Sequence, residues 1–326
     1  MPDSAANLPP CHGLIAAWRL GDAATPLTPP DVARMVEDGE GPLWLHLDLV
    51  DARARQFLLA LPGLPAAARA ALVEAEETTR VEVAAGALFG CLPDIHFDAE
   101  AQGAPPVGLL HFALSPGLLV TARRHPLRGV HLALETPRVT LPAEALGSVL
   151  RHAMLEFAQV IGLLARQMAL IEDQLLRPDR NPPRDALATL RREALRLSRH
   201  LDPLAEALDD LAEDCPAPLA PLAAPLLLEA RRSRAAARAL AAVLERGRIA
   251  QDQAASRVAE ETNRRLLVLS VISAAMLPAS LVAGIFGMNV GGLPGVESPG
   301  GFAMALSLIA ASVGGVLLAL RLGRML

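Results

Sequence analysis

The chain has 326 residues, of which 52% are hydrophobic and 20% are charged, and its formal net charge is −5. This length can bury the core of one or two domains, and the acidic balance argues against nucleic acid as a partner. Three widely spaced cysteines, Cys11, Cys91 and Cys215, exclude a zinc-finger spacing or a disulfide framework and fit a reducing cytoplasm. No signal peptide is expected at the N-terminus, because Met1 is not followed by a basic and then an apolar stretch.

A cytoplasmic α/β domain is expected over residues 1–140, where short apolar runs alternate with turns. Helices are expected over residues 50–77 and 125–136. The runs expected as strands are GLIAAWRL, PLWLHLDL, RVEVAAGALFGCLPDIHF, VGLLHFAL and GLLVTARR. Asp94, His96 and Asp98 alternate in the third run and so share one strand face. We favour a polar strand face there, with a cytoplasmic metal site as the alternative.

A helical region with a long stalk is expected over residues 141–265. Helices are predicted over 143–177 and 184–214, separated by prolines, and a third runs from about Pro225 into the apolar segment that follows. Its sparse apolar stripe is expected to pack against other subunits, because one small domain cannot cover so long a helix. The second helix is acidic near its end, and its face is either solvated or a docking site for cytoplasmic cations, with Asp209, Asp210 and Glu213 as candidate ligands.

Two uncharged segments near the C-terminus have the length of membrane spans. Residues 266–286 (LLVLSVISAAMLPASLVAGIF) make a helix of roughly 30 Å, and residues 302–320 are just long enough to do the same. Arginines precede the first segment and follow the second, in the basic tail 321–326, whereas the loop 287–301 carries only one charge, Glu297. The positive-inside rule then places both termini in the cytoplasm and the loop outside.

The first span is more than a lipid anchor. Its small and polar residues recur at helical spacing and share one face: Asn263, Leu266, Ser270, Ser273, Leu277, Ser280, Gly284 and Gly287. Such a face points at other helices or at water, and helix packing alone is the simpler alternative. Pro278 should bend the helix locally.

The turn after the first span is the strongest candidate site. Gly287, Met288 and Asn289 end the span, and further glycines force an irregular backbone. If several copies of the span surround an axis, the Asn289 amides form a ring whose oxygens can hydrogen-bond the water shell of a cation. Dinucleotide, P-loop, Gly-x-Ser-x-Gly and His-Glu-x-x-His motifs are absent from the sequence, so neither an enzyme nor a bound cofactor is expected.

The chain resembles the CorA superfamily of divalent-cation transporters. Gly-Met-Asn ends the penultimate span, precedes a short outer loop and a final span, and follows a long helix and an α/β domain. The loop GMNVGGLPG and the run EAEETTRVE (residues 74–82) are similar to the ZntB branch, associated with zinc, although Val81 replaces a proline usual there. The magnesium branch typically continues with an aromatic residue and Met-Pro-Glu.

This resemblance implies a homopentamer in the inner or plasma membrane, with the first span lining a pore. Asn289 would be the outer selectivity ring and Asn263 a polar ring at the cytoplasmic mouth. The other positions implied to face the pore are Thr262, Leu266, Leu269, Leu277, Ser280 and Gly284, with the leucines as hydrophobic constrictions; Ser273 joins them from the periodicity.

Zinc uptake is the leading expectation, and its proton coupling is implied by the resemblance alone. A CorA-type channel for Mg²⁺ or Co²⁺ is the alternative of the same class, and Ni²⁺ and Cd²⁺ are further possible cargoes. A membrane-anchored cytoplasmic sensor that conducts nothing is the alternative of a different class.

Overall fold

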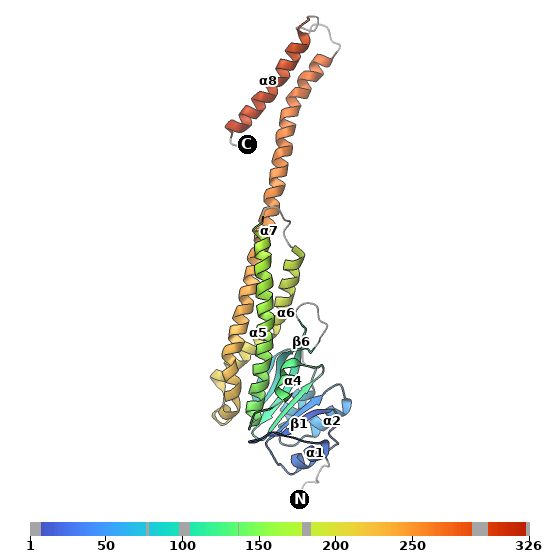
Figure 1. The fold of residues 1–326 in the computed structure, drawn as a ribbon, viewed down its shortest axis with the longest axis vertical. Helices are drawn as coiled ribbons and strands as arrows, with labels where there is room; N and C mark the ends of the chain where they lie inside the picture. The colour runs from blue at the N-terminus through green and yellow to red at the C-terminus, as the bar shows by residue number, and fades with distance from the viewer. Residues whose placement is uncertain are drawn as a thin grey trace. The chain divides into compact units, whose positions relative to one another are not determined.

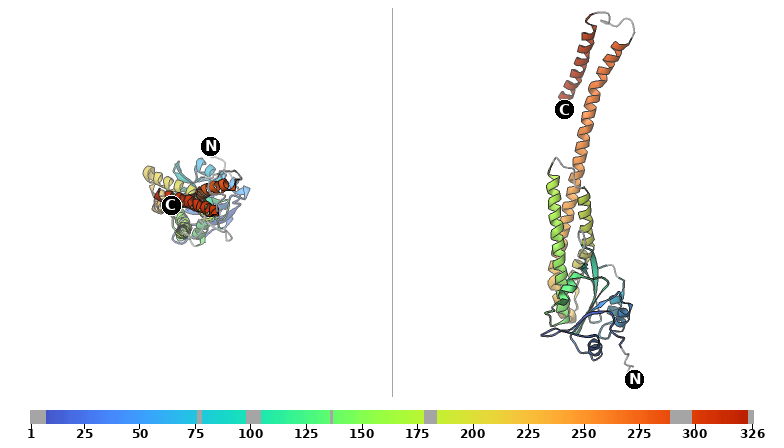
Figure 2. Two further views of the ribbon diagram at one scale, coloured as in Figure 1. Left: turned by 90° about the horizontal axis from the view of Figure 1, so that it is seen from above. Right: turned by 45° about the vertical axis from the view of Figure 1, so that its right-hand side comes forward.

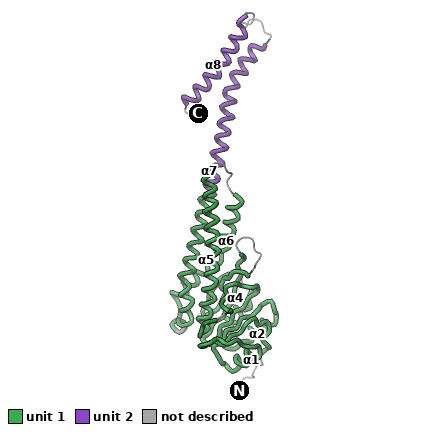
Figure 3. Tube along the Cα trace, viewed as in Figure 1, with its two compact units in different colours: residues 1–251 green, residues 252–326 purple. Residues whose placement is uncertain are grey.

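The computed structural model describes residues 8–75, 78–97, 105–135, 137–177, 184–288 and 299–323. These residues fall into two compact units, a first unit of residues 1–251 and a second unit of residues 252–326 (Figures 1 and 3). The first unit holds a mixed α/β sheet domain and three long helices, and the second holds the apolar helices. An α+β domain followed by long helices and apolar C-terminal helices confirms the predicted fold class.

Among the described residues, seven strands form one sheet in the order β2-β1-β3-β7-β6-β5-β4. The strands are β1 (Leu14–Arg19), β2 (Thr25–Pro26), β3 (Leu43–Asp48), β4 (Arg80–Ala84), β5 (Ala87–Ile95), β6 (Val107–Ser115) and β7 (Leu118–Arg123). β3 and β7 pair in parallel at the centre of the sheet, and every other neighbouring pair is antiparallel.

Helices cover both faces of this sheet. The helices are α1 (Pro29–Glu37), α2 (Ala52–Ala60), α3 (Ala66–Val73), α4 (Arg128–Glu135), α5 (Pro142–Leu175), α6 (Arg184–Asp214), the short 3₁₀ helix η1 (Ala217–Leu219), α7 (Ala220–Gly287) and α8 (Gly301–Leu322). Because side chains alternate along a strand, β3 turns Leu43, Leu45 and Leu47 to the cluster built with α1–α3 and Trp44 to the other face. The other face is covered by α4 and α5. Each such buried side chain contributes about 1.5–3 kcal/mol.

The run from residue 80 to residue 97 was expected to be strand, and it contains two strands, β4 and β5, instead of one continuous strand. It folds back on itself as the β4–β5 hairpin, whose two turn residues, Ala85 and Gly86, both have positive φ, 47° and 83°. Two consecutive positive φ angles are the mark of a type I′ turn, which matches the twist of paired strands. Gly90 is required in β5, since a Cβ there would lie 2.2 Å from the backbone oxygen of Arg80.

The predicted helices over 143–177 and 184–214 correspond to α5 and α6. The expected apolar face of α5 is buried, including Leu146, Leu150, Phe157 and Leu164. Residues 50–77 contain two helices, α2 and α3. α1 was not predicted, although Val32, Met35 and Val36 follow the i, i+3, i+4 spacing of a buried helix face and two prolines mark its start.

Part of the stripe of α7 is buried within the first unit, where the expectation had other subunits cover it. Leu226, Ala230 and Leu240 are at most 3% exposed, whereas Ala237 and Leu244 are half-buried. Helices α5, α6 and α7 run side by side in the first unit (Figures 1 and 2). α5 and α6 also pack against the sheet. Arg246 of α7 donates two hydrogen bonds, of 2.9 and 2.5 Å, to the carboxylate of Glu172 on α5.

Candidate functional site

The second unit consists of the end of α7 and the helix α8. The part of α7 from residue 266 to residue 286 has no charged side chain, and many of its large apolar side chains are exposed in the single chain. Leu266 is 55% exposed, Leu269 60% and Leu277 71%. Apolar surface exposed over this length requires a lipid bilayer or other copies of the chain to cover it.

The candidate pore positions share one helical face, because α7 is continuous through all of them. All eight are exposed in the single chain: Thr262, Asn263, Leu266, Leu269, Ser273, Leu277, Ser280 and Gly284. Pro278 lies within the same helix and removes one backbone donor from it. The face therefore remains available to line a pore or to pack against another helix.

The turn that follows lies at the edge of the described residues. α7 ends at Gly287, and the backbone N–H of Met288 donates to the carbonyl of Ile285 at 3.3 Å. Asn289 and Glu297 lie outside the described residues. The candidate selectivity ring therefore rests on the sequence motif and on the helix that leads to it.

Within the described part of the chain, three helices are long and apolar enough to cross a membrane: α5, α7 and α8. The apolar windows of α7 and α8 contain no residue buried within the chain, whereas 39% of the window of α5 is buried. The buried residues of α5 form the apolar face that packs against the sheet and against α4.

Asp94, a candidate metal ligand, caps the start of α4 in the first unit. Its carboxylate is 1% exposed and accepts backbone N–H bonds from Gly129 at 2.8 Å and Val130 at 2.9 Å, at the start of α4. Negative charge is favoured at a helix N-terminus, where these N–H groups have no partner inside the helix. His96 pairs with Leu127 through an isolated bridge, and Asp98 lies outside the described residues.

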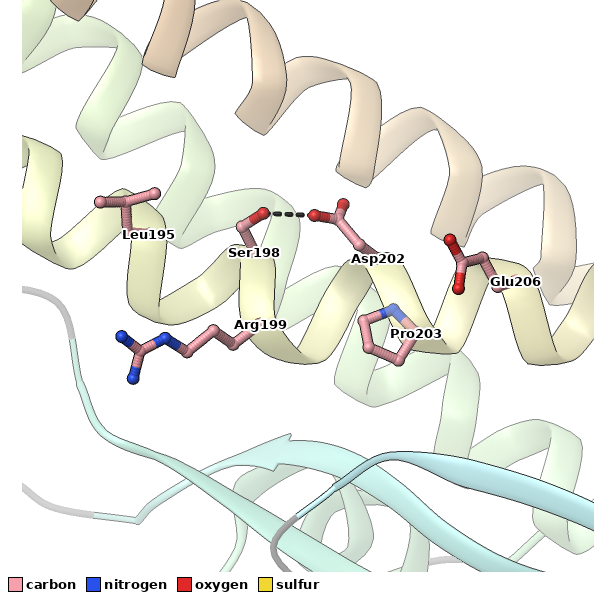
Figure 4. Close-up of a pocket in the computed structure, with 6 residues that line it drawn as sticks. All are labelled: Leu195, Ser198, Arg199, Asp202, Pro203 and Glu206. Atoms are coloured by element: carbon pink, nitrogen blue, oxygen red, sulfur yellow. Dashed lines mark hydrogen bonds between the residues drawn. The ribbon is translucent and has the colours of Figure 1, made fainter.

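The acidic end of α6 holds the other candidate metal ligands. Asp209 forms an ion pair with Arg234 of α7, at 2.7 Å from Oδ1 to Nη2, whereas Asp210 and Glu213 are exposed. Earlier on the helix a shallow depression surrounds Ser198, whose hydroxyl donates to Asp202; Asp202 and Glu206 point to one side of α6 and Arg199 to the other (Figure 4). No three His, Cys, Asp or Glu side chains are placed to hold a metal ion in the residues described.

The buried carboxylate of Asp94 gives a testable pH dependence. Burial raises the pKa of Asp94 to about 6 and outweighs the hydrogen bonds from Val130, Gly129 and Ile95, which lower it. A pKa raised above the unfolded value means that the protonated form is favoured on folding. The contribution of protonated Asp94 to the free energy of unfolding is therefore full below about pH 4 and is lost as the pH rises through about 6. In total this contribution is on the order of 2–3 kcal/mol.

In the variant Asp94→Asn this part of the pH dependence should disappear. Thermal unfolding of the detergent-solubilised protein between pH 4 and pH 7 measures it. The fall in Tm over that range should be several degrees smaller than in the natural protein. Asp210→Asn, an exposed carboxylate on α6, serves as the control and should keep the natural slope. An unchanged slope in Asp94→Asn would contradict the assignment.

An α/β sheet domain, long packed helices and exposed, uncharged C-terminal segments are features of membrane proteins, and the family comparison assigns the class of transport protein. The family described as "CorA-like Mg2+ transporter protein" matches residues 39–323. The chain therefore belongs to the CorA-like family of divalent-cation transporters.

Relatives of known name support this membership. The chain is 25% identical over 318 residues to the "Zinc transport protein ZntB" of Pectobacterium carotovorum subsp. carotovorum (strain PC1), covering 93% of both chains. It is 29% identical over 279 residues to the "Divalent cation transporter CmaX" of Pseudomonas aeruginosa, covering 83% of both.

Solved structures show the same fold. The full-length CmaX protein has a TM-score of 0.78 and 25% sequence identity, with 99% of both chains covered. The CorA magnesium transporter of Methanocaldococcus jannaschii has a TM-score of 0.74 and 15% identity, with 94% of this chain and 96% of that chain covered.

Proposed function

We propose that the protein carries Zn²⁺ across the inner or plasma membrane through a pore lined by α7 in a homopentamer. The observation that carries this proposal is the exposed, uncharged face of α7 between Thr262 and Gly284, which leads directly to the Gly-Met-Asn turn. A single copy leaves this face uncovered, and several copies around an axis would enclose a water-filled path.

Residues 266–286 and 302–320 serve as the two spans in this proposal. Helix α5 is assigned to the cytoplasm, because its apolar face is already used in the first unit. Arg257, Arg264 and Arg265 before the first span and Arg321 after the second place both termini inside by the positive-inside rule. The loop 287–301, with Glu297, then faces the outside.

A ring of Asn289 side chains is proposed as the outer filter. Neutral amide oxygens can hydrogen-bond the water shell of a divalent cation without removing it, and no carboxylate lies within the spans to bind the bare ion. Asn263 would form a second polar ring near the cytoplasmic mouth. Leu266, Leu269 and Leu277 would form the apolar constrictions between the two rings.

We propose zinc rather than magnesium as the transported ion for two reasons. Val290, Gly291 and Gly292 follow the Gly-Met-Asn motif, and a relative that aligns with 93% of the chain is named a zinc transport protein. A channel for Mg²⁺ or Co²⁺ remains the alternative of the same class. It is favoured by the family's description and by the fold shared with a magnesium transporter.

Flux into proteoliposomes separates these two cargoes. Purified protein should take up radioactive Zn²⁺ well above protein-free vesicles and above its own Mg²⁺ flux. In a parallel arm an inward proton gradient is applied. It should increase the zinc flux, because the resemblance to the ZntB branch implies that protons drive zinc uptake. Magnesium flux without zinc flux would overturn the choice of zinc, and no flux of either ion would favour the non-conducting sensor.

A further inference from the structure

A cavity of about 330 Å³ lies in the first unit, beside the start of β6 and against α6. It brings together four of the eight histidines of the chain, which are scattered in the sequence. Its lining consists of His96, Val107, Gly108, Leu109, His111, Arg124, His125, Leu127 and His200. The transport proposed above uses none of these residues.

Four separate segments supply the polar side chains of this cavity. His96 directly follows β5, His111 lies in β6, Arg124 and His125 follow β7, and His200 lies on α6. The rings of His96 and His125 stack at 5.0 Å between centroids. The sheet register and the position of α6 thus bring these four histidines together, and no local sequence pattern predicts that they meet.

Gly108 makes room for this arrangement at the first residues of β6. A Cβ on Gly108 would lie 2.5 Å from Nε2 of His96 and 2.8 Å from a methyl carbon of Leu127. The ring of His96 therefore rests on the bare backbone of the strand. A side chain at this position would push that ring away from its place in the lining.

Among the residues that the structure describes, those that line the cavity include no carboxylate, although the whole chain is acidic. Burial lowers the pKa of His200, and the positive charges of Arg199 and Arg196 on the same helix lower it further. Burial likewise lowers the pKa of His111, with further lowering from Arg124 and Arg80 and an opposing contribution from Glu74 and from the hydrogen bond to the carbonyl of Ala71. Burial is the larger cause of both shifts, and the arginines add positive charge beside Arg124 of the lining.

The remaining lining is apolar and suits the carbon part of a ligand. Val107 and Leu109 are partly exposed along β6, and Leu127 is 1% exposed. A small molecule with anionic groups at one end and an apolar body would match both parts of the cavity. A positive potential disfavours a metal cation, and the described histidines do not converge as a group of three or more ligands.

We propose that this cavity binds a small organic anion bearing phosphate or carboxylate groups, with Arg124 as the main charged partner. The guanidinium of Arg124 offers several N–H donors in the planar arrangement that suits phosphate and carboxylate oxygens. His96 and His125, whose rings adjoin, and His200 from α6 can add ring N–H donors. The site would sense the cytoplasmic supply of that anion, independently of the ion carried through the membrane.

Isothermal titration of the purified full-length protein in detergent tests this proposal. The probes are inorganic phosphate in one arm and citrate in the other, at constant ionic strength. At least one of them should bind saturably with one site per chain, and the two arms show whether phosphate or carboxylate is preferred. In the double variant Arg124→Gln/His200→Gln the affinity should fall at least about tenfold, as expected for lost charged hydrogen bonds.

The matched control is Arg34→Gln/His12→Gln, which removes one arginine and one histidine of the first unit that do not line the cavity. It should keep the natural affinity. A second test variant, Val107→Glu, leaves Arg124 and His200 in place and adds a negative charge to the lining; it should also weaken binding.

Either of two results would overturn the proposal: no saturable binding of phosphate or citrate to the natural protein, or equal affinities in the test and control variants. A titration with Zn²⁺ covers the metal alternative. Zinc binding that is lost in His200→Gln, together with no anion binding, would reassign the cavity as a metal site. None of these readouts depends on zinc transport, so they stay informative if the proposed function fails.

Discussion

The variant Asn289→Ala is expected to reduce zinc flux into proteoliposomes by about tenfold or more. In the proposed pentamer each substitution removes one amide oxygen from the ring that hydrogen-bonds the hydrated ion. A hydrogen bond to a cation's water shell contributes about 0.5–1.5 kcal/mol, so the loss from all subunits together exceeds the 1.4 kcal/mol of a tenfold effect. The measurement is the initial rate of radioactive zinc uptake at equal protein content.

Asn181→Ala provides the matched control, since it makes the same change at a position between α5 and α6 in the sequence, far from the proposed pore residues in the chain. Its flux should equal that of the natural protein. If Asn289→Ala also transports at the natural rate, Asn289 is a turn residue only, and the ring must be abandoned. A sensor that conducts nothing would show no flux in any of the three proteins.

The variant Leu277→Arg should block transport, with flux falling by more than about 100-fold. Leu277 is 71% exposed on the face of α7 assigned to the pore. An arginine stays charged at every working pH. At about 5 Å, one such charge repels a divalent cation by roughly 2 kcal/mol even at the dielectric constant of water, and every subunit adds its own.

Leu277→Met keeps the size and apolar character of the side chain and should retain most of the flux. Size-exclusion chromatography and the yield of reconstitution establish that both variants assemble to the same degree. A well-assembled Leu277→Arg variant with natural flux would show that this position faces lipid or another helix. The face assigned to the pore would then need to be rotated about the axis of α7.

Long, regular helices and the uncharged segments were predicted correctly. The helix over residues 143–177 and the buried face with Leu146, Phe157 and Leu164 follow from a regular 3.6-residue period over many turns. The uncharged segment 266–286 is apparent from its composition alone. The hairpin at Ala85 and Gly86 was missed, because the residues on both sides of it have a strand pattern and no Asn-Gly or Asp-Gly pair marks the turn.

The role of Asp94 could not be read from the sequence. Its alternation with His96 indicated a shared strand face, but the partners of its carboxylate are the N–H groups of Gly129 and Val130, some thirty-five residues further along the chain. Gly129 also permits the close approach, since a Cβ there would lie 2.9 Å from Oδ1 of Asp94. Only the packing of α4 against β5 reveals this contact.

The sequence by itself determined the apolar C-terminal segments, the long helices and the Gly-Met-Asn motif, because hydropathy, helical period and a contiguous motif are local properties. The tertiary structure decided what covers the stripe of α7, what Asp94 binds and which histidines meet in the cavity beside α6. These depend on contacts between segments far apart in the chain, which sheet order and helix packing fix and which no local pattern encodes.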